Sequence, residues 1–243
     1  MWSAIWVALA IAVVPAQPAP AIPDREGEPR VAWRDSIAVG SPESGRLEDG
    51  VRFPAEGRAF FTWDPILRRS PDRDWRRWGA DELVRKTLHV LREFRRDHPT
   101  APRVGVGDLS LPTGGYFGPE VGGGIGHATH QNGLDVDVYY PRLDRRERPP
   151  ESPAEVDLAL SQDLLDLFVA AGAVTVYVGP SLPLEGPGDV VVPLVNHDNH
   201  LHARFAPRAG AAGYLPLRSV RAPTRASGTR PSRRPRRRVP LRP

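Results

Sequence analysis

The chain has 243 residues, contains no cysteine and carries a formal net charge of +4 at pH 7. The lack of cysteine excludes disulfides, thiolate metal ligands and a cysteine nucleophile, so that a metal site must use His, Asp or Glu. The length suits one domain with terminal extensions. The basic excess is local: the residues from Leu217 onward hold ten arginines and no acid, and without them the formal charge is about −6 (4 − 10).

Residues 1–21 have the pattern of a secretory signal peptide. An apolar run over residues 1–14 is followed by small residues that offer cleavage after Ala16, Ala19 or Ala21. The run is shorter than the roughly 20 residues that a membrane-spanning helix needs. We therefore expect an extracytoplasmic protein, either periplasmic or secreted to the cell wall.

The rest of the chain divides by composition into three parts. They are a Pro-rich linker at 22–35, a folded domain at 36–216 and an Arg/Pro-rich tail at 217–243. The tail lacks the apolar surface needed to fold, and we expect it to be disordered. Its arginines indicate binding to anionic wall polymers or a membrane surface. Nucleic acid, whose binding depends strongly on salt, is disfavoured by the signal peptide, and the oligomeric state stays open.

Hydrophobic periodicity predicts an α+β domain, with a small, mainly antiparallel sheet and flanking helices. One amphipathic helix is expected at 80–97. A second is expected to begin at a capping box, Ser152-Pro-Ala-Glu155, and to run to about Ala171, stopping at Gly172. Strands are expected at 36–40, 103–107, 134–140, 174–178, 190–195 and 200–205.

The segment 68–78 is rich in arginine and also contains Trp75 and Trp78. Two interpretations stay open for it. The segment either packs at the rim of the domain or forms one wall of a binding groove.

Five of the seven histidines lie in two short polar segments. The first histidine segment, residues 126–139, follows a run of three glycines and contains His127, His130, Asp135 and Asp137. The second histidine segment, residues 196–202, contains His197, His200 and His202. A lone His-x-His pair is typical of two surface histidines. The combination of both segments instead predicts the two halves of one metal site.

Strand alternation predicts which of these side chains share a face. Asp135 and Asp137 fall on one face of their strand. His200, His202 and Arg204 fall on one face of theirs, with the two imidazoles about 6.5–7 Å apart along the chain. Neutral imidazole and carboxylate are common zinc ligands, and a catalytic zinc site keeps three of them and one open position.

Four motifs carry a resemblance to a known family. They are Gly107-Asp-Leu-Ser, Pro112-x-Gly-Gly, His127-x-x-His-Gln-x-Gly-Leu-Asp-Val-Asp137 and His197-Asp-x-His-x-His-x-Arg204. Over about residues 36–207 the chain resembles the penicillin-insensitive murein endopeptidases. That family belongs to the wider superfamily of lysostaphin, D-Ala-D-Ala peptidases and Hedgehog, which implies a fold of that type.

The superfamily motif is a histidine, six residues, an aspartate and a distant His-x-His. Seven positions after His130 stands Asp137, whereas seven after His127 stands Leu134, which cannot bind metal. The resemblance therefore implies that His130, Asp137 and His202 bind Zn²⁺.

The resemblance also implies the roles of the remaining polar residues. His200 would be catalytic, acting near a zinc-bound water either as a base or as a stabiliser of the oxyanion. Five residues would support the metal or contact the substrate: His127, His197, Asp135, Asp108 and Arg204. For Asp108 a turn cap stays open as the alternative.

The activity implied is that of a zinc-dependent endopeptidase, which cleaves peptide cross-links of peptidoglycan by attack of a zinc-bound water. The cross-links implied join D-alanine to meso-diaminopimelate, with links between two diaminopimelates as a further option. The alternative is a non-catalytic, zinc-containing cell-wall-binding module of the same superfamily. The complete His/Asp/His set, together with His200, argues against that alternative.

Overall fold

The computed structural model describes residues 29–208. The expected signal peptide, the first part of the expected linker and the arginine-rich tail lie outside these residues. Among the helices of residues 29–208, none combines the length and the apolar character required to cross a bilayer.

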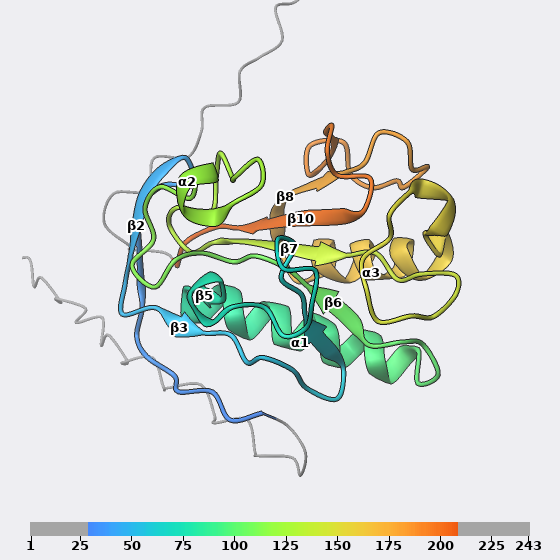
Figure 1. Cartoon of the computed structure of the whole chain (residues 1–243), viewed down its shortest axis with the longest axis horizontal. Coiled ribbons are helices and arrows are strands. Elements are labelled where there is room, and N and C mark those ends of the chain that lie inside the picture. The colour runs from blue at the N-terminus through green and yellow to red at the C-terminus, as the bar shows by residue number, and fades with distance from the viewer. Residues whose placement is uncertain (1–28, 209–243) are drawn as a thin grey trace, which may run out of the picture.

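The centre of the fold is a six-stranded mixed sheet with the strand order β4-β6-β7-β10-β8-β9 (Figure 1). Its strands are β4 (Phe60–Thr62), β6 (Val104–Val106), β7 (Asp135–Tyr139), β10 (His200–Phe205), β8 (Ala173–Val178) and β9 (Val191–Pro193). The three inner pairings are antiparallel, and the pairings with the edge strands β4 and β9 are parallel. Together with the helices, the sheet confirms the predicted α+β class.

Smaller elements surround the sheet. β1 (Ile37–Ser41) and β2 (Ser44–Glu48) form an antiparallel hairpin, and β3 (Val51–Arg52) pairs with β5 (Trp78–Gly79). The short helical turns are η1 (Asp74–Arg76), α2 (Pro119–Gly122) and η2 (Pro153–Glu155).

Two longer helices, α1 (Asp81–Asp97) and α3 (Leu158–Ala170), pack against each other and share the main core with the sheet. The apolar face of α1 is buried as its periodicity predicts, and Leu83, Leu91 and Phe94 are almost fully inaccessible. Full burial of each such side chain contributes about 1.5–3 kcal/mol. This core holds the two central strands in place from one side.

The central strands β7 and β10 present their polar side chains on the face opposite this core. Their antiparallel register places His202 beside Asp137 and Arg204 beside Asp135. The residues between them, such as Val136 and Leu201, belong to the core. Because side chains alternate along each strand, the acidic side chains of β7 and the basic side chains of β10 lie together on one face of the sheet.

The predicted start of the second helix is wrong. Ser152 makes no capping hydrogen bond, and α3 begins only at Leu158, where Asp157 Oδ1 accepts from the Leu160 amide at 3.2 Å. The Glu155 carboxylate bonds to the Glu151 amide and to the Arg142 guanidinium, so it does not close the capping box.

Candidate metal centre

Among the histidine rings around the carboxylate of Asp137, those of His127, His130 and His202 each have one nitrogen held by a buried acceptor. The three hydrogen bonds run from His130 Nδ1 to the Leu109 carbonyl oxygen, from His202 Nε2 to Asp135 Oδ1 at 2.8 Å, and from His127 Nε2 to Asp108 Oδ2 at 2.7 Å. Hydrogen bonds of this kind set the tautomer and the orientation of metal-binding imidazoles. Each ring is thereby turned so that its other nitrogen faces Asp137.

The distances divide these rings between the two oxygens of Asp137. His130 Nε2 lies 3.4 Å and His202 Nδ1 lies 3.2 Å from Asp137 Oδ1. His127 Nδ1 lies 3.7 Å from Asp137 Oδ2. Two nitrogens therefore converge on one carboxylate oxygen, and the third approaches the other.

The donor set fits a divalent metal ion. His130 Nε2 and Asp137 Oδ1 are both buried and have no hydrogen-bond partner among residues 29–208. A buried polar atom without a partner costs about 1–3 kcal/mol, and a cation held between these two atoms satisfies both. Imidazole nitrogen and carboxylate oxygen together suit zinc and similar transition metals.

Two sets of three ligands can be drawn from these residues. The first is the set expected from the sequence, His130, Asp137 and His202. The second replaces His202 with His127, and its three ligand atoms lie within 4.8 Å of one another. His130 and Asp137 belong to both sets.

Asp135 anchors the second half of the centre. Its buried carboxylate accepts from the His130 amide at 3.2 Å, from His202 Nε2 at 2.8 Å and from Arg204 Nε at 2.7 Å. Burial by itself raises the pKa of Asp135. The neighbouring His202 and Arg204 lower it by more, so the pKa of Asp135 lies below its ordinary value. Asp135 therefore stays charged and holds the His202 ring in place.

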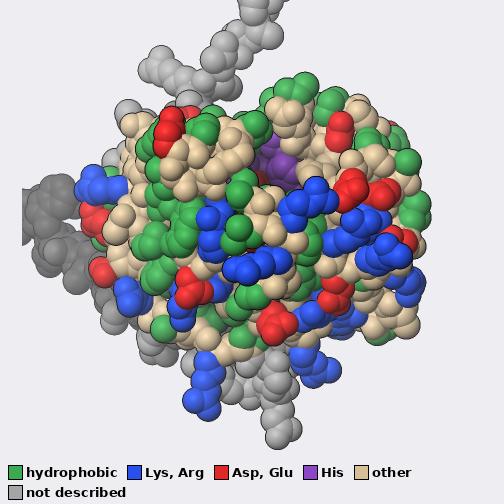
Figure 2. Space-filling model, in the orientation of Figure 1, with side chains coloured by type: hydrophobic (Ala, Val, Ile, Leu, Met, Phe, Trp, Pro, Cys, Tyr) green, Lys and Arg blue, Asp and Glu red, His purple; other side chains and the backbone are tan. Residues whose placement is uncertain are grey.

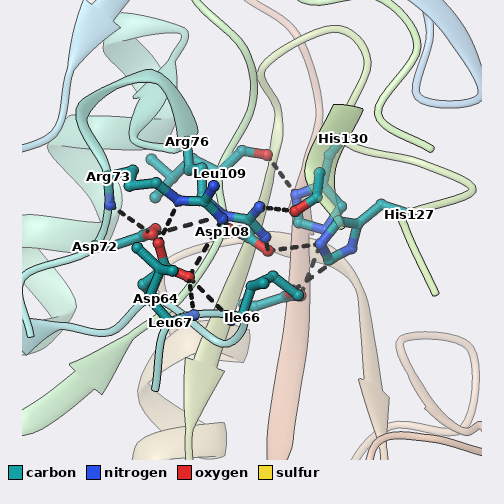
Figure 3. Close-up of polar contacts among 12 residues, drawn as sticks. Asp64, Ile66, Leu67, Asp72, Arg73, Arg76, Asp108, Leu109, His127 and His130 are labelled. Carbon is teal, nitrogen blue, oxygen red and sulfur yellow. Dashed lines mark hydrogen bonds and ion pairs between the residues drawn. The ribbon is translucent and has the colours of Figure 1, made fainter. Parts of the chain in front are cut away.

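Asp108 anchors the other half through a buried charged cluster (Figure 3). Arg76 donates to both carboxylate oxygens of Asp108, from Nε to Oδ1 and from Nη2 to Oδ2, each at 2.5 Å. It also donates to the Gly122 carbonyl oxygen. The cluster continues to Asp72, 3.5 Å from Arg76, and to the pair of Asp64 and Arg73. Three carboxyl groups thus face two guanidiniums. Burial and the nearby Asp108 raise the pKa of Asp72 to about 8, so Asp72 is protonated at pH 7 and the two guanidiniums face two charged carboxylates.

The loop that carries His127 is folded tightly against α2. Gly126 has a φ of +70°, and a Cβ there would lie 2.5 Å from the Pro119 nitrogen, so only glycine fits. The turn lets the His127 amide donate to the Phe117 carbonyl oxygen at 2.8 Å. The turn and this hydrogen bond hold the loop close to α2.

His200 lies at the solvent side of the centre. Its Nδ1–H donates to Asn199 Oδ1 at 2.7 Å, and its Nε2 lies 3.7 Å from Asp137 Oδ1. Burial lowers the pKa of His200 to about 4, so the ring is neutral at pH 7 and Nε2 can accept a proton. His197 packs beside it, with ring centroids 4.8 Å apart, and donates to the Val195 carbonyl oxygen.

Figure 2 shows histidine side chains at the bottom of a hollow, between the α2 segment and the loops at the β8–β9 end of the sheet, with basic side chains on the rim. The centre is therefore accessible from this face.

Comparison of the sequence with known protein families identifies the family of this chain. The profile of the family described as penicillin-insensitive murein endopeptidase matches residues 38–165, which is more than half of the chain. The chain belongs to this family.

Curated members of the penicillin-insensitive murein endopeptidase family show how far the likeness extends. A protein of this name from Pectobacterium atrosepticum is 31% identical over 140 residues, covering 56% of this chain and 46% of the relative. The Yersinia enterocolitica protein is 24% identical over 194 residues, covering 69% and 65% respectively. One from Yersinia pestis is 30% identical over 123 residues, covering 49% and 41%. The chain thus spans about half the length of the curated relatives it matches.

The family match contains only the first histidine segment, since it ends at residue 165. The second histidine segment joins the centre through the pairing of β10 with β7. The structure brings all nine of the expected site residues to one region. They are His127, His130, Asp135, Asp137, Asp108, His197, His200, His202 and Arg204.

Two residues of this murein endopeptidase family member were missed by sequence reasoning. Arg76 was part of an arginine-rich segment that could have been a rim, and only its burial shows that it holds Asp108. Asn199 orients His200, and its place between two histidines was the one available signal.

Asp72 provides a test of the charged cluster. Burial and the nearby Asp108 raise the pKa of Asp72 to about 8. A carboxyl group whose pKa is raised by folding stabilises the protein below its unfolded pKa, and this contribution is lost as the pH rises towards 8. We expect Asp72→Asn, compared with the native chain, to gain at least about 1 kcal/mol of unfolding free energy between pH 5 and pH 8.5, about the worth of one pKa unit.

The measurement is urea unfolding of the metal-free protein at several pH values. Asp189→Asn, at an exposed position, is the control and should leave the pH profile unchanged. Identical pH profiles for Asp72→Asn and the native chain would show that Asp72 ionises normally.

Proposed function

We propose that this protein is a zinc-dependent endopeptidase that hydrolyses peptide cross-links of peptidoglycan, of the type joining D-alanine to meso-diaminopimelate. The observation that carries the proposal is the convergence of His130 Nε2 and His202 Nδ1 on Asp137 Oδ1 at the bottom of an open hollow. Membership of the murein endopeptidase family supports the substrate class.

In this proposal His130, Asp137 and His202 hold the zinc ion. His130 and His202 are more deeply buried than His127, whose side chain is 22% exposed, and they face the same oxygen. When bound, zinc polarises a carbonyl group and lowers the pKa of a water molecule to about 7. His127 would stay fixed by Asp108 and support the centre from the side of Asp137 Oδ2.

His200 would act as the general base and then as the general acid. Its Nδ1–H is committed to Asn199, so the proton-free Nε2 is the atom that faces the centre. It can take a proton from the attacking water while the new C–O bond forms at the scissile carbonyl carbon. The same proton can then pass to the departing amine when the C–N bond breaks.

A direct test is the digestion of purified sacculi followed by muropeptide analysis. The native protein should convert cross-linked muropeptides to monomers, and EDTA should stop this reaction. His200→Ala should keep zinc and lose activity by roughly 100- to 10,000-fold, the usual contribution of general acid–base catalysis. Full activity in a zinc-loaded His200→Ala variant would exclude the assigned role.

The same experiment separates the proposal from a non-catalytic wall-binding module. A zinc-loaded native protein that binds sacculi and releases no monomers would be such a module.

The proposal also includes the location and layout of the chain. The protein would act outside the cytoplasm, with residues 1–21 as a signal peptide and residues 36–216 as the catalytic domain. The arginine-rich tail, residues 217–243, would bind anionic wall polymers. Wall association that persists at low salt after deletion of this tail would show that the tail has no such role.

A further inference from the structure

A groove with a volume of ≈ 800 Å³ opens beside the second histidine segment. Four parts of the chain form it: the stretch after β4, the end of β7, the loop before η2 and the second histidine segment. Its lining includes Trp63, Arg68, Tyr139, Arg148, Glu151 and Asn199. The volume is in the range of sites that bind small ligands, roughly 300–1,000 Å³.

The groove adjoins the candidate metal centre directly. Asn199 lines it and accepts the hydrogen bond from His200 Nδ1. Tyr139 also lines it, with its ring centroid 6.1 Å from that of His200. The groove therefore offers room for a part of a peptide whose scissile bond lies at His200.

The two arginines of the groove share a single carboxylate oxygen. Arg68 Nη2 lies 2.6 Å and Arg148 Nη1 lies 2.9 Å from Glu151 Oε1. A guanidinium has five donors, so each arginine has more donors than this one contact uses. Arg148 Nε, moreover, is buried and has no hydrogen-bond partner among the residues described.

The other acid of the groove does not neutralise these arginines. Asp198 Oδ1 accepts from the Ser181 amide and Oδ2 accepts from the Ser181 hydroxyl, both at 3.1 Å. Asp198 is thus committed to the loop after β8. Two guanidiniums against one carboxylate leave the wall formed by Arg68, Arg148 and Glu151 with an excess of positive charge.

We propose that this groove is a subsite for a carboxylate group of the peptide substrate, which Arg68 and Arg148 bind together. Glu151 holds both guanidiniums in position and competes with the substrate carboxylate for them. Guanidinium groups suit this task because their planar, forked donors match a carboxylate. The inference rests on the proposed function, since it names which part of an acidic peptide the same site recognises.

The test uses two probes, a cross-linked peptide dimer with free carboxyl groups and the same dimer with those groups converted to amides. The native protein should prefer the free acid. In Arg68→Gln/Arg148→Gln the kcat/KM for the acid should fall by about 10- to 100-fold, mainly through KM, as expected for lost hydrogen bonds to a charged group. The kcat/KM for the amide should change little, so the preference disappears.

The matched control is Arg146→Gln. Arg146 lies on the same loop, pairs with Asp144 and is not part of the groove lining. It should leave both substrates unaffected.

Glu151→Gln is expected to change the KM for the acid in the opposite direction. This effect distinguishes substrate binding from a purely structural role. If Glu151 competes with the substrate, its removal frees both arginines and lowers the KM for the acid by several-fold. If the three residues only join two loops, Glu151→Gln and the double arginine variant should impair both probes alike, and the inference is then wrong.

Calorimetric binding of both probes to the zinc-loaded protein separates this inference from the proposed function. Preferred binding of the acid without cleavage of either probe would support the subsite and refute the endopeptidase. Cleavage of both probes with equal KM values and equal affinities would support the endopeptidase and refute the subsite.

Discussion

His202→Ala is expected to lower the affinity for zinc by about 1,000-fold. The corresponding loss of free energy is about a third of the binding free energy of a typical protein zinc site. His202 Nδ1 lies 3.2 Å from Asp137 Oδ1, and its other nitrogen is fixed by Asp135. His127→Ala should lower the affinity by only about 10- to 100-fold, the usual effect of losing a residue that supports a ligand. Endopeptidase activity should follow the same order.

The measurement is a competition titration with a chromophoric chelator, together with the metal content after dialysis. His98→Ala is the control, because His98 pairs with Asp163 on α3, away from the centre. A larger loss for His127→Ala than for His202→Ala would reverse the assignment and make His127, His130 and Asp137 the ligands.

Arg76→Met is expected to cost about 3–5 kcal/mol of unfolding free energy. The side chain of Arg76 is 1% exposed and binds both carboxylate oxygens of Asp108, so its removal leaves a buried carboxylate without a counter-charge. The Gly122 carbonyl oxygen also loses its donor. The loop that carries His127 should therefore loosen, and zinc affinity should fall as well.

Chemical denaturation measures the stability, and Arg52→Gln is the matched control. Arg52 also pairs with an aspartate, Asp74, but both side chains are more than half exposed. Such a pair is worth about 0–1 kcal/mol. Should Arg76→Met prove too unstable to purify, Arg76→Met/Asp108→Asn removes the uncompensated charge and should recover part of the stability. A loss for Arg76→Met as small as that for Arg52→Gln would show that the cluster tolerates the missing charge.

Much of the fold follows from local patterns in the sequence. The apolar periodicity of residues 80–97 predicts α1 to within a residue, and the alternation of residues 200–205 predicts β10. These patterns are reliable because one face of each element must be buried. The predicted start of α3 was wrong because Ser152 and Asp157 are both good capping residues. Only the contact of Glu155 with Arg142, which keeps Glu155 from completing the capping box, decides between them.

The candidate site divides in the same way. The spacing of His130 and Asp137, and the His-x-His of His200 and His202, are properties of the sequence and led directly to one region of the structure. The sequence also determined which side chains share a strand face, since the period of a strand is two residues.

Only the tertiary structure decided the partners of these residues. Asp108 and Asp135 look alike as single aspartates, yet one orients His127 and the other His202. Arg68 and Arg76 come from the same arginine-rich segment, but one lines an open groove and the other is buried. The physical reason is that burial and charge pairing depend on contacts between segments far apart in the chain, which local sequence patterns do not encode.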